Sequence, residues 1–193
     1  MTRQTIQDKL FALYRVSSEQ LTDFLQGGNF DRYGIKANEF DVFCAFWTTA
    51  CYLRSTATPA AREVENFNKS IVVTIVDRII AASPEELSAE QLEALSQTVT
   101  DVFVERFSGY RDFFQADLQQ RENESIRLFP RLVEGFLGSV LDAPVADHSP
   151  VRQLFDGILA DMLNRAVIFF AGATGDAGHG RQDEGREGKG KIA

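Results

Sequence analysis

Residues 70–80 read Ser70-Ile71-Val72-Val73-Thr74-Ile75-Val76-Asp77-Arg78-Ile79-Ile80, and their secondary structure decides the fold class. By β-propensity alone the run 71–76 favours a strand, because β-branched side chains pack well on a pleated sheet. The apolar residues, however, recur at helical spacing, while Ser70, Thr74, Asp77 and Arg78 lie off that stripe. We therefore predict a helix here and an all-α fold for the chain.

Helix starts on either side of this stretch are marked by proline. Three of the five prolines directly follow Ser or Thr, at Thr58-Pro59, Ser83-Pro84 and Ser149-Pro150. A Ser or Thr oxygen accepts from the free N–H groups of a first turn, where proline also fits. These pairs predict helices over 58–82 and 149–170, and a short turn after 83 that precedes a long helix ending near 120–123. Ser83 with Glu86 reads as a capping box, and Ser88 with Gln91 repeats that signal.

The remaining apolar segments predict the other helices of the bundle. They cover 2–16, then a short helix capped by Ser17 or Ser18 that ends at Gly27-Gly28, then 39–54 capped by Asn38, and 124–141. Pro130 is expected to kink the last of these, and Gly135 and Gly138 would permit the close approach of a neighbour. The prediction is one globular bundle of six or seven helices over residues 1–171.

The last part of the chain consists of an amphipathic helix, a short stretch that is apolar on all sides, and a segment rich in Gly and charged residues. The helix over 149–170 is expected to bury an inner side made of Val151, Leu154, Phe155, Ile158, Leu159, Met162 and Phe169. Residues 166–171 are apolar all round, so we expect them to be buried in the protein or at a subunit contact. Residues 172–193 contain seven Gly and only one apolar residue larger than Ala, Ile192, and are predicted to be a disordered tail.

The composition favours a cytoplasmic globular protein. The chain has 193 residues, 44% of them hydrophobic, including sixteen Phe. It has no run of 18 apolar residues and no apolar signal segment at its start, so neither a membrane span nor secretion is indicated. Cys44 and Cys51 lie about 10 Å apart along one predicted helix, too far to form a disulfide, and should be buried, inert thiols.

The negative charge is concentrated in one part of the sequence. Residues 83–148 carry five Arg and thirteen acidic residues, which accounts for the whole net charge of −8. A surface of this sign repels phosphate backbones and anionic lipids, so we expect neither nucleic acid nor membrane as a partner. It suits a basic protein partner or simply solubility.

Candidate catalytic residues are few. The chain has only two histidines, and His179 lies in the tail. The pattern therefore indicates no di-iron bundle, zinc protease or haem site, and no phosphate-binding glycine motif is present. His148, just before the Ser149 cap, is the one candidate acid–base residue, and we interpret it as an ordinary loop residue. We assign no catalytic, cofactor-binding or metal-binding residues.

Two weak metal patterns remain. Residues 29–39 resemble a calcium-binding EF-hand loop, with Asn29, Asp31, Tyr33 and Gly34 in register, but Ile35 and Glu39 each come one residue early. We therefore expect an ordinary connection there, anchored by Phe30 and Tyr33. The acidic residues of the long helix include the pair Glu90 and Glu93 and a shared face of Asp101, Glu105 and Asp112, which we interpret as solvated.

The function predicted from these features is non-enzymatic: a cytoplasmic helical protein that binds a protein partner, or a second copy of itself, through an apolar helix face. One alternative is a ligand-binding or sensory domain with a Phe-lined pocket. Another is a metal-dependent helical hydrolase that uses the acidic face of residues 101–117.

Overall fold

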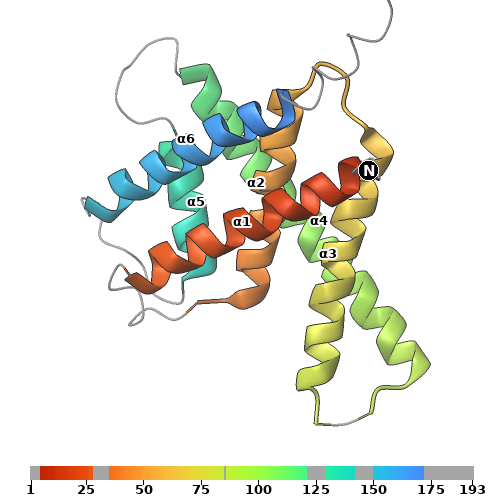
Figure 1. Ribbon diagram of the computed structural model, residues 1–193. Coiled ribbons are helices and arrows are strands. Elements are labelled where there is room, and N and C mark those ends of the chain that lie inside the picture. The colour runs from red at the N-terminus through yellow and green to blue at the C-terminus, as the bar shows by residue number, and fades with distance from the viewer. Residues whose placement is uncertain (1–4, 28–34, 85, 121–128, 142–149, 172–193) are drawn as a thin grey trace, which may run out of the picture.

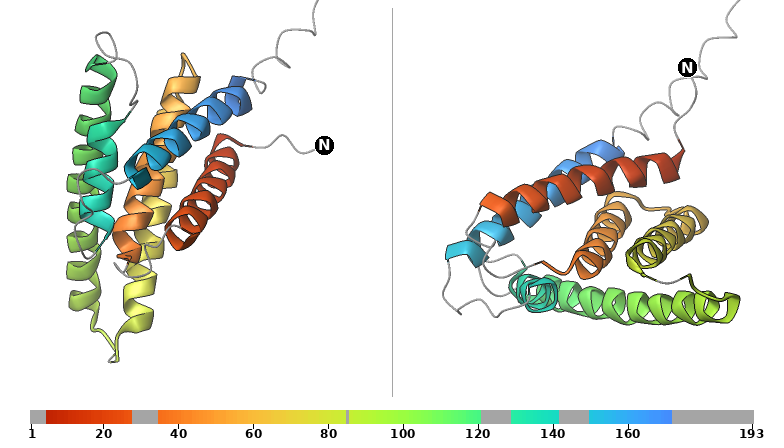
Figure 2. Two further views of the ribbon diagram at one scale, coloured as in Figure 1. Left: turned by 90° about the vertical axis from the view of Figure 1, so that its left-hand side faces the viewer. Right: turned by 90° about the horizontal axis from the view of Figure 1, so that it is seen from below.

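The computed structural model describes residues 5–27, 35–84, 86–120, 129–141 and 150–171. These residues form six helices and no strand, apart from an isolated bridge between Ile35 and Leu141, so the predicted all-α fold is confirmed. The helices are α1 (Ile6–Gly27), α2 (Ala37–Ser55), α3 (Ala61–Ala82), α4 (Ala89–Gln120), α5 (Pro130–Val140) and α6 (Pro150–Ala171). They lie in three layers: α4 with α5, α2 with α3, and α1 with α6 (Figures 1 and 2).

Helix α2 is the centre of the fold and contacts every other helix. All thirteen residues from Phe40 to Tyr52 are buried. Phe43 is the hub of an aromatic cluster, with ring centroids 4.2 Å from Phe136 of α5 and 5.1 Å from Tyr110 of α4. Trp47 is fully buried and meets the ring of Phe129 edge-on at 5.4 Å. Aromatic side chains therefore fill much of the core around one enclosed helix.

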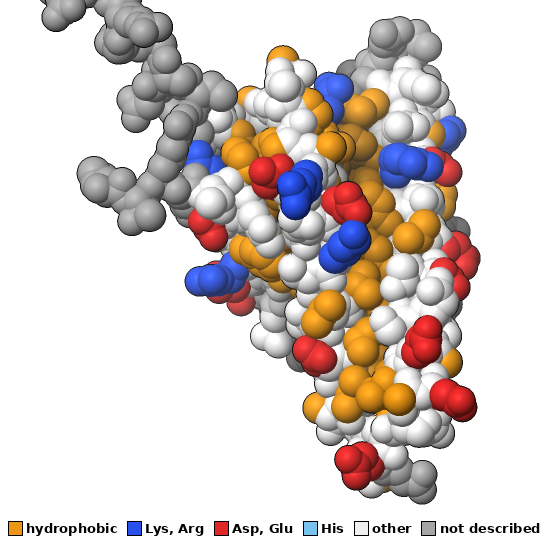
Figure 3. All heavy atoms as spheres, turned by 90° about the vertical axis from the view of Figure 1, so that its right-hand side faces the viewer, with side chains coloured by type: hydrophobic (Ala, Val, Ile, Leu, Met, Phe, Trp, Pro, Cys, Tyr) orange, Lys and Arg blue, Asp and Glu red, His pale blue; other side chains and the backbone are white. Residues whose placement is uncertain are grey.

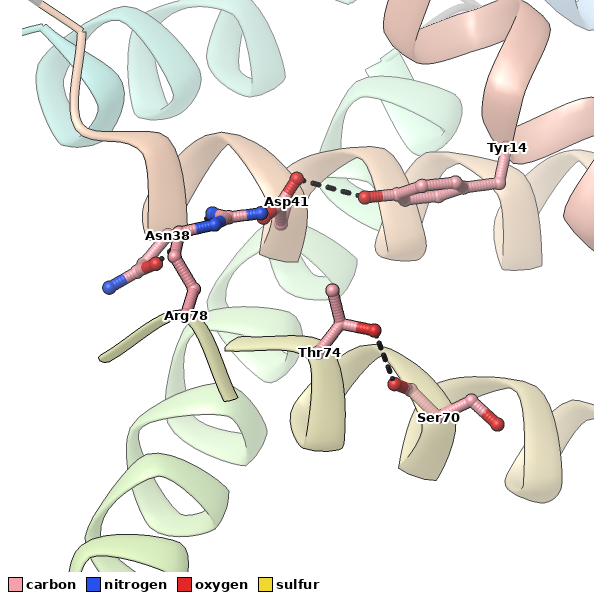
Figure 4. A network of polar contacts seen from close by, with 6 residues as sticks. All are labelled: Tyr14, Asn38, Asp41, Ser70, Thr74 and Arg78. Carbon is pink, nitrogen blue, oxygen red and sulfur yellow. Dashed lines mark hydrogen bonds and ion pairs between the residues drawn. The ribbon is translucent and has the colours of Figure 1, made fainter. Parts of the chain in front are cut away.

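The stretch that decides the fold class is helical, as predicted. Residues 70–80 lie inside α3, where Ile71 and Ile75 are buried one turn apart. The Thr74 hydroxyl donates to the carbonyl oxygen of Ser70, at 3.0 Å (Figure 4). This local bond satisfies a polar group within a β-branched run, so the run fits a helix with one buried side.

Of the helix caps predicted at Thr58, Ser83 and Ser88, only the cap at Ser88 is correct. The Ser88 N–H donates to the Gln91 side chain at 2.8 Å, and the Gln91 N–H donates to the Ser88 hydroxyl at 3.3 Å, so α4 starts with the second capping box. Ser83 instead ends α3, because its N–H donates to the carbonyl of Ile80. Thr58 caps nothing: α3 begins at Ala61, and the Ala60 N–H donates to the Tyr52 hydroxyl at 3.0 Å.

The N-terminal part of the chain forms one helix where two were predicted. Helix α1 runs unbroken through Ser17, which is buried inside it, while the side chain of Ser18 bonds to Cys44. Its start is a reciprocal pair of hydrogen bonds between Thr5 and Asp8. The predicted Asn38 cap is also wrong, because Asn38 lies within the first turn of α2 and its amide oxygen accepts from Arg78.

Pro130 begins a helix and does not kink one. It occupies the first turn of α5, where its missing N–H costs nothing, and the part of the predicted helix before residue 129 lies outside the described residues. The free N–H groups of this turn are satisfied from other helices. Asp117 of α4 accepts from Arg131 at 3.1 Å and from Leu132 at 2.9 Å, and Asp156 of α6 accepts from Phe129.

The two glycines of α5 differ in their surroundings. A Cβ at Gly135 would lie 2.5 Å from the ring of Phe113, so this position does permit a close approach, as predicted. A Cβ at Gly138 would meet no atom within 4 Å, so the prediction is wrong there.

Candidate functional site

Helices α3 and α4 form a hairpin whose far end extends beyond the other helices (Figure 1). Its two helices still pack on each other, with Ile75 and Phe103 buried between them. Grooves follow both sides of this pair. The other helices do not cover the part of the hairpin that extends beyond them. Exposed apolar side chains on such a helix pair make the hairpin a candidate binding element.

The first surface is one side of the hairpin, here called the hairpin face. A groove of about 550 Å³ runs along it, with Val72, Phe103 and Phe107 partly or fully buried in its floor and Val73 and Val104 at its edges. Val73 is 56% exposed and Val104 is 57% exposed. Figure 3 shows hydrophobic side chains in a continuous column that reaches the lower end of the molecule.

The opposite side of the hairpin carries a second groove, of about 580 Å³, here called the elbow groove. The N-terminus of α2 forms one end of it, and Ile75, Ile79, Val99 and Val102 are among its apolar residues. Glu39 lines this groove and forms an ion pair with Arg106, at 3.2 Å.

A polar network closes the α2 end of the elbow groove (Figure 4). Arg78 lies 2.6 Å from one carboxylate oxygen of Asp41 and 3.2 Å from the amide oxygen of Asn38. The hydroxyl of Tyr14 donates to the other oxygen of Asp41 at 2.9 Å. Burial, with the charge of Asp41, raises the pKa of Tyr14 far above its usual value, which keeps the phenol protonated. The network therefore joins α1, α2 and α3.

The third surface is the outward side of α6. Residues 166–171 were expected to be buried in the protein or at a subunit contact, and three of them are exposed: Val167 by 39%, Ile168 by 73% and Phe169 by 44%. Of the predicted inner residues, Phe155, Leu159 and Met162 are buried and Ile158 is half-buried, but Leu154 and Phe169 are exposed, and the side chain of Val151 is not described. A groove of about 570 Å³ lies between this side and α1.

The two thiols are buried, as predicted, on α2. Burial raises the pKa of Cys44 and of Cys51 well above that of a free cysteine, and the nearby Asp41 carboxylate adds to the effect at Cys44. A protonated, enclosed thiol is a poor nucleophile, so neither cysteine is a candidate catalytic group.

The acidic residues of α4 considered for metal binding are all exposed on that one helix. Asp101, Glu105 and Asp112 are exposed on α4, as are Glu90 and Glu93. Within the described residues, no group of three or more metal-ligating side chains comes together. Glu39, the last position of the calcium-like pattern, is paired with Arg106. His148, His179, Asn29, Asp31, Tyr33, Gly34 and the tail 172–193 lie outside the described residues.

Sequence reasoning missed two sets of residues. Asp117 and Asp156 give no signal, because they cap a helix that starts at a distant position in the chain. Val73 and Val104 are 56% and 57% exposed beside the groove, and neither was singled out from the sequence. The outward side of α6 did carry a signal, since its end was apolar all round.

Comparisons with known proteins give no relative. No family model matches the chain, and no curated protein or solved structure matches it. Among the described helices, none is both long and apolar enough to cross a bilayer.

Proposed function

We propose that this is a non-enzymatic cytoplasmic protein that binds a protein partner through the hairpin face. The observation that carries the proposal is the exposure of Val73 and Val104 on either side of an apolar groove, on a helix pair that extends from the body. Grooves between two helices receive the apolar side of a third helix in many protein complexes. By helical spacing, Val76 and Ile80 extend the same side of α3 for two further turns.

The charge around this face favours a basic partner. Helix α4 carries six acidic residues and two Arg, and it lies in the part of the sequence that holds the whole net charge. Glu93 lies three turns before Val104, on the same side of α4, and Glu65 lines the groove, where Lys69 pairs with it at 2.6 Å. An amphipathic helix with Leu-like residues on one side and Lys or Arg on the other complements this surface in shape and sign.

Model peptides test this proposal directly. A labelled Leu/Lys amphipathic peptide of about 20 residues, long enough to fold as a helix, is titrated with the protein and followed by fluorescence anisotropy. A Leu/Glu peptide of the same pattern is the charge control. The Val104→Asp variant should lose binding of the Leu/Lys peptide, whereas Val16→Asp, at a valine 49% exposed on α1, should retain it. Equal binding by V104D and wild type, or equal binding of the two peptides, would contradict the proposal.

The elbow groove supports a second candidate function, the binding of a small apolar molecule. The aromatic cluster around Phe43 is packed, so the predicted Phe-lined pocket is replaced here by a surface groove with Ile and Val walls. A fluorescent apolar dye should bind the wild type. The Val102→Asp variant should bind the dye more weakly, and the control variant V16D should bind it as the wild type does. Identical dye binding by V102D and wild type would remove this candidate.

A further inference from the structure

Helix α6 carries two different seams. Its inner residues Phe155, Leu159, Met162, Ala166 and Phe170 are buried against the other helices. An outer seam follows the alternating four-and-three spacing of a coiled coil, through Leu154, Ile158, Asp161, Arg165 and Ile168. Leu154 is 60% exposed and Ile168 is 73% exposed, so the ends of this outer seam are apolar and uncovered within the described chain.

The middle of the outer seam is a charge pair of opposite signs. Arg165 lies 2.7 Å from Asp161, one turn away, and both side chains are more than half exposed. If the helix is placed antiparallel to a copy of itself, each Asp161 meets the Arg165 of the other copy. The pair is therefore self-complementary under a two-fold axis, and a polar pair inside an apolar seam sets the register of such a contact.

We propose that the outer seam of α6 binds the α6 of a second copy of this chain, in an antiparallel two-fold dimer. With Asp161 opposite Arg165, the axis crosses the outer seam at the level of residue 163. The same axis brings Ile158 opposite Ile168 and places Gly157 at the height of Phe169 of the other copy. Ile168, the exposed apolar residue at one end of the seam, thus meets an apolar residue of the other helix with no further adjustment of the register.

Gly157 provides the space that this arrangement requires. It is exposed, and a Cβ built on it would meet no atom within 4 Å. It lines the groove between α1 and α6 together with Leu154, Ile158 and Phe24. A large side chain at position 157 would therefore stand at the edge of the seam and obstruct the approach of a second copy.

The outer layer offers two helices to the contact. Helices α1 and α6 lie in the same outer layer, so each copy offers two helices to the contact (Figure 2). The 22 residues of α6 span about 33 Å, and stable dimers bury about 1,200–2,000 Å² in total. The contact uses a different layer from the hairpin face, so this inference is independent of the proposed partner.

Analytical ultracentrifugation of the full chain at concentrations up to about 100 µM tests the dimer, since this range detects micromolar association. Wild type should sediment as a concentration-dependent dimer. Gly157→Phe fills open space, so it should fold as wild type does, with the same circular dichroism spectrum, but weaken association at least about tenfold. Asp161→Arg should weaken association because it places like charges across the axis. The double swap Asp161→Arg with Arg165→Asp should restore it.

Three results would overturn the proposal. The first is a wild type that stays monomeric over the whole concentration range. The second is a dimer that persists in G157F, or that the double charge swap does not restore. The third is a dimer that V104D abolishes and G157F leaves intact, because this would place self-association on the hairpin face. Peptide binding by the hairpin face is measured separately, so the failure of either proposal leaves the other testable.

Discussion

Helices α2 and α6 are both rich in apolar residues, but they differ in how much of their surface the other helices bury. Helix α2 lies in the middle layer and is enclosed on all sides from Phe40 to Tyr52. Helix α6 lies in an outer layer, and its apolar end leaves Val167, Ile168 and Phe169 exposed. Apolar content therefore shows that a helix needs cover but does not show what covers it. For α2 the cover is the chain itself, and for α6 we infer a second copy.

The largest expected effect comes from the enclosed helix. Trp47→Ala removes a fully buried ring from α2 and should lower the free energy of unfolding by about 3–5 kcal/mol. Ile168→Ala on the outer seam of α6, measured by urea unfolding at a concentration where the protein is monomeric, should change it by less than about 0.5 kcal/mol. Equal losses in the two variants would mean that Ile168 is covered within one chain.

Buried and exposed carboxylates should differ in the same way. Asp117→Ala leaves two N–H groups at the start of α5 without their acceptor and should cost about 2–3 kcal/mol of unfolding free energy. Asp161→Ala breaks an exposed pair within one helix and should cost only about 0.3–0.5 kcal/mol in the monomer. A D117A variant as stable as D161A would show that Asp117 does not cap α5.

Glycines provide a third comparison. Gly135→Ala forces a methyl group against the ring of Phe113 and should destabilise the protein by about 1–2 kcal/mol. Gly157→Ala enters open space and should stabilise the monomer by about 0.5–1 kcal/mol, because alanine favours a helix. Thermal unfolding of both variants measures the difference, and a destabilised G157A would contradict the open position that the dimer requires.

The smallest expected effect is a pH dependence. Burial raises the pKa of Asp117 above its ordinary value of 3.8, and the two backbone N–H groups oppose this shift. The folded state therefore holds the proton more tightly than the unfolded state. The resulting contribution to stability is complete below about pH 3.8 and is lost as the pH rises through the folded-state pKa.

Asp117→Asn should remove this pH dependence. Across that window, the stability of wild type relative to D117N should fall as the pH rises, as urea midpoints at each pH would measure. A relative stability of wild type that rises with pH would mean that the N–H groups dominate over burial at Asp117.

Local patterns predicted much of this fold. The helical spacing in 70–80, the Ser88–Gln91 cap and the apolar end of α6 were all readable, because their causes lie within a few residues. The starts of α3 and α5 could not be predicted in this way, because side chains from other helices accept hydrogen bonds from their first N–H groups. These side chains are Tyr52, Asp117 and Asp156. Ser17 resembled a cap, yet it is buried within one continuous helix.

The binding surfaces were predictable only in kind. An apolar helix face was expected, and the apolar end of α6 indicated one place for it. The hairpin face could not be located, because the sequence does not show which apolar residues, such as Val73 and Val104, stay exposed once α3 and α4 pack together. Which stripe of a helix faces inward depends on the packing of all six helices.

Hydrogen exchange at two protein concentrations tests the central contrast between α2 and α6 most directly. Peptides from residues 40–52 should be equally protected at low and at high micromolar concentration, because α2 is enclosed by its own chain. Peptides from residues 154–169 should exchange more slowly at the higher concentration, and G157F should abolish that difference. Exchange of α6 that is independent of concentration in the wild type would contradict the account.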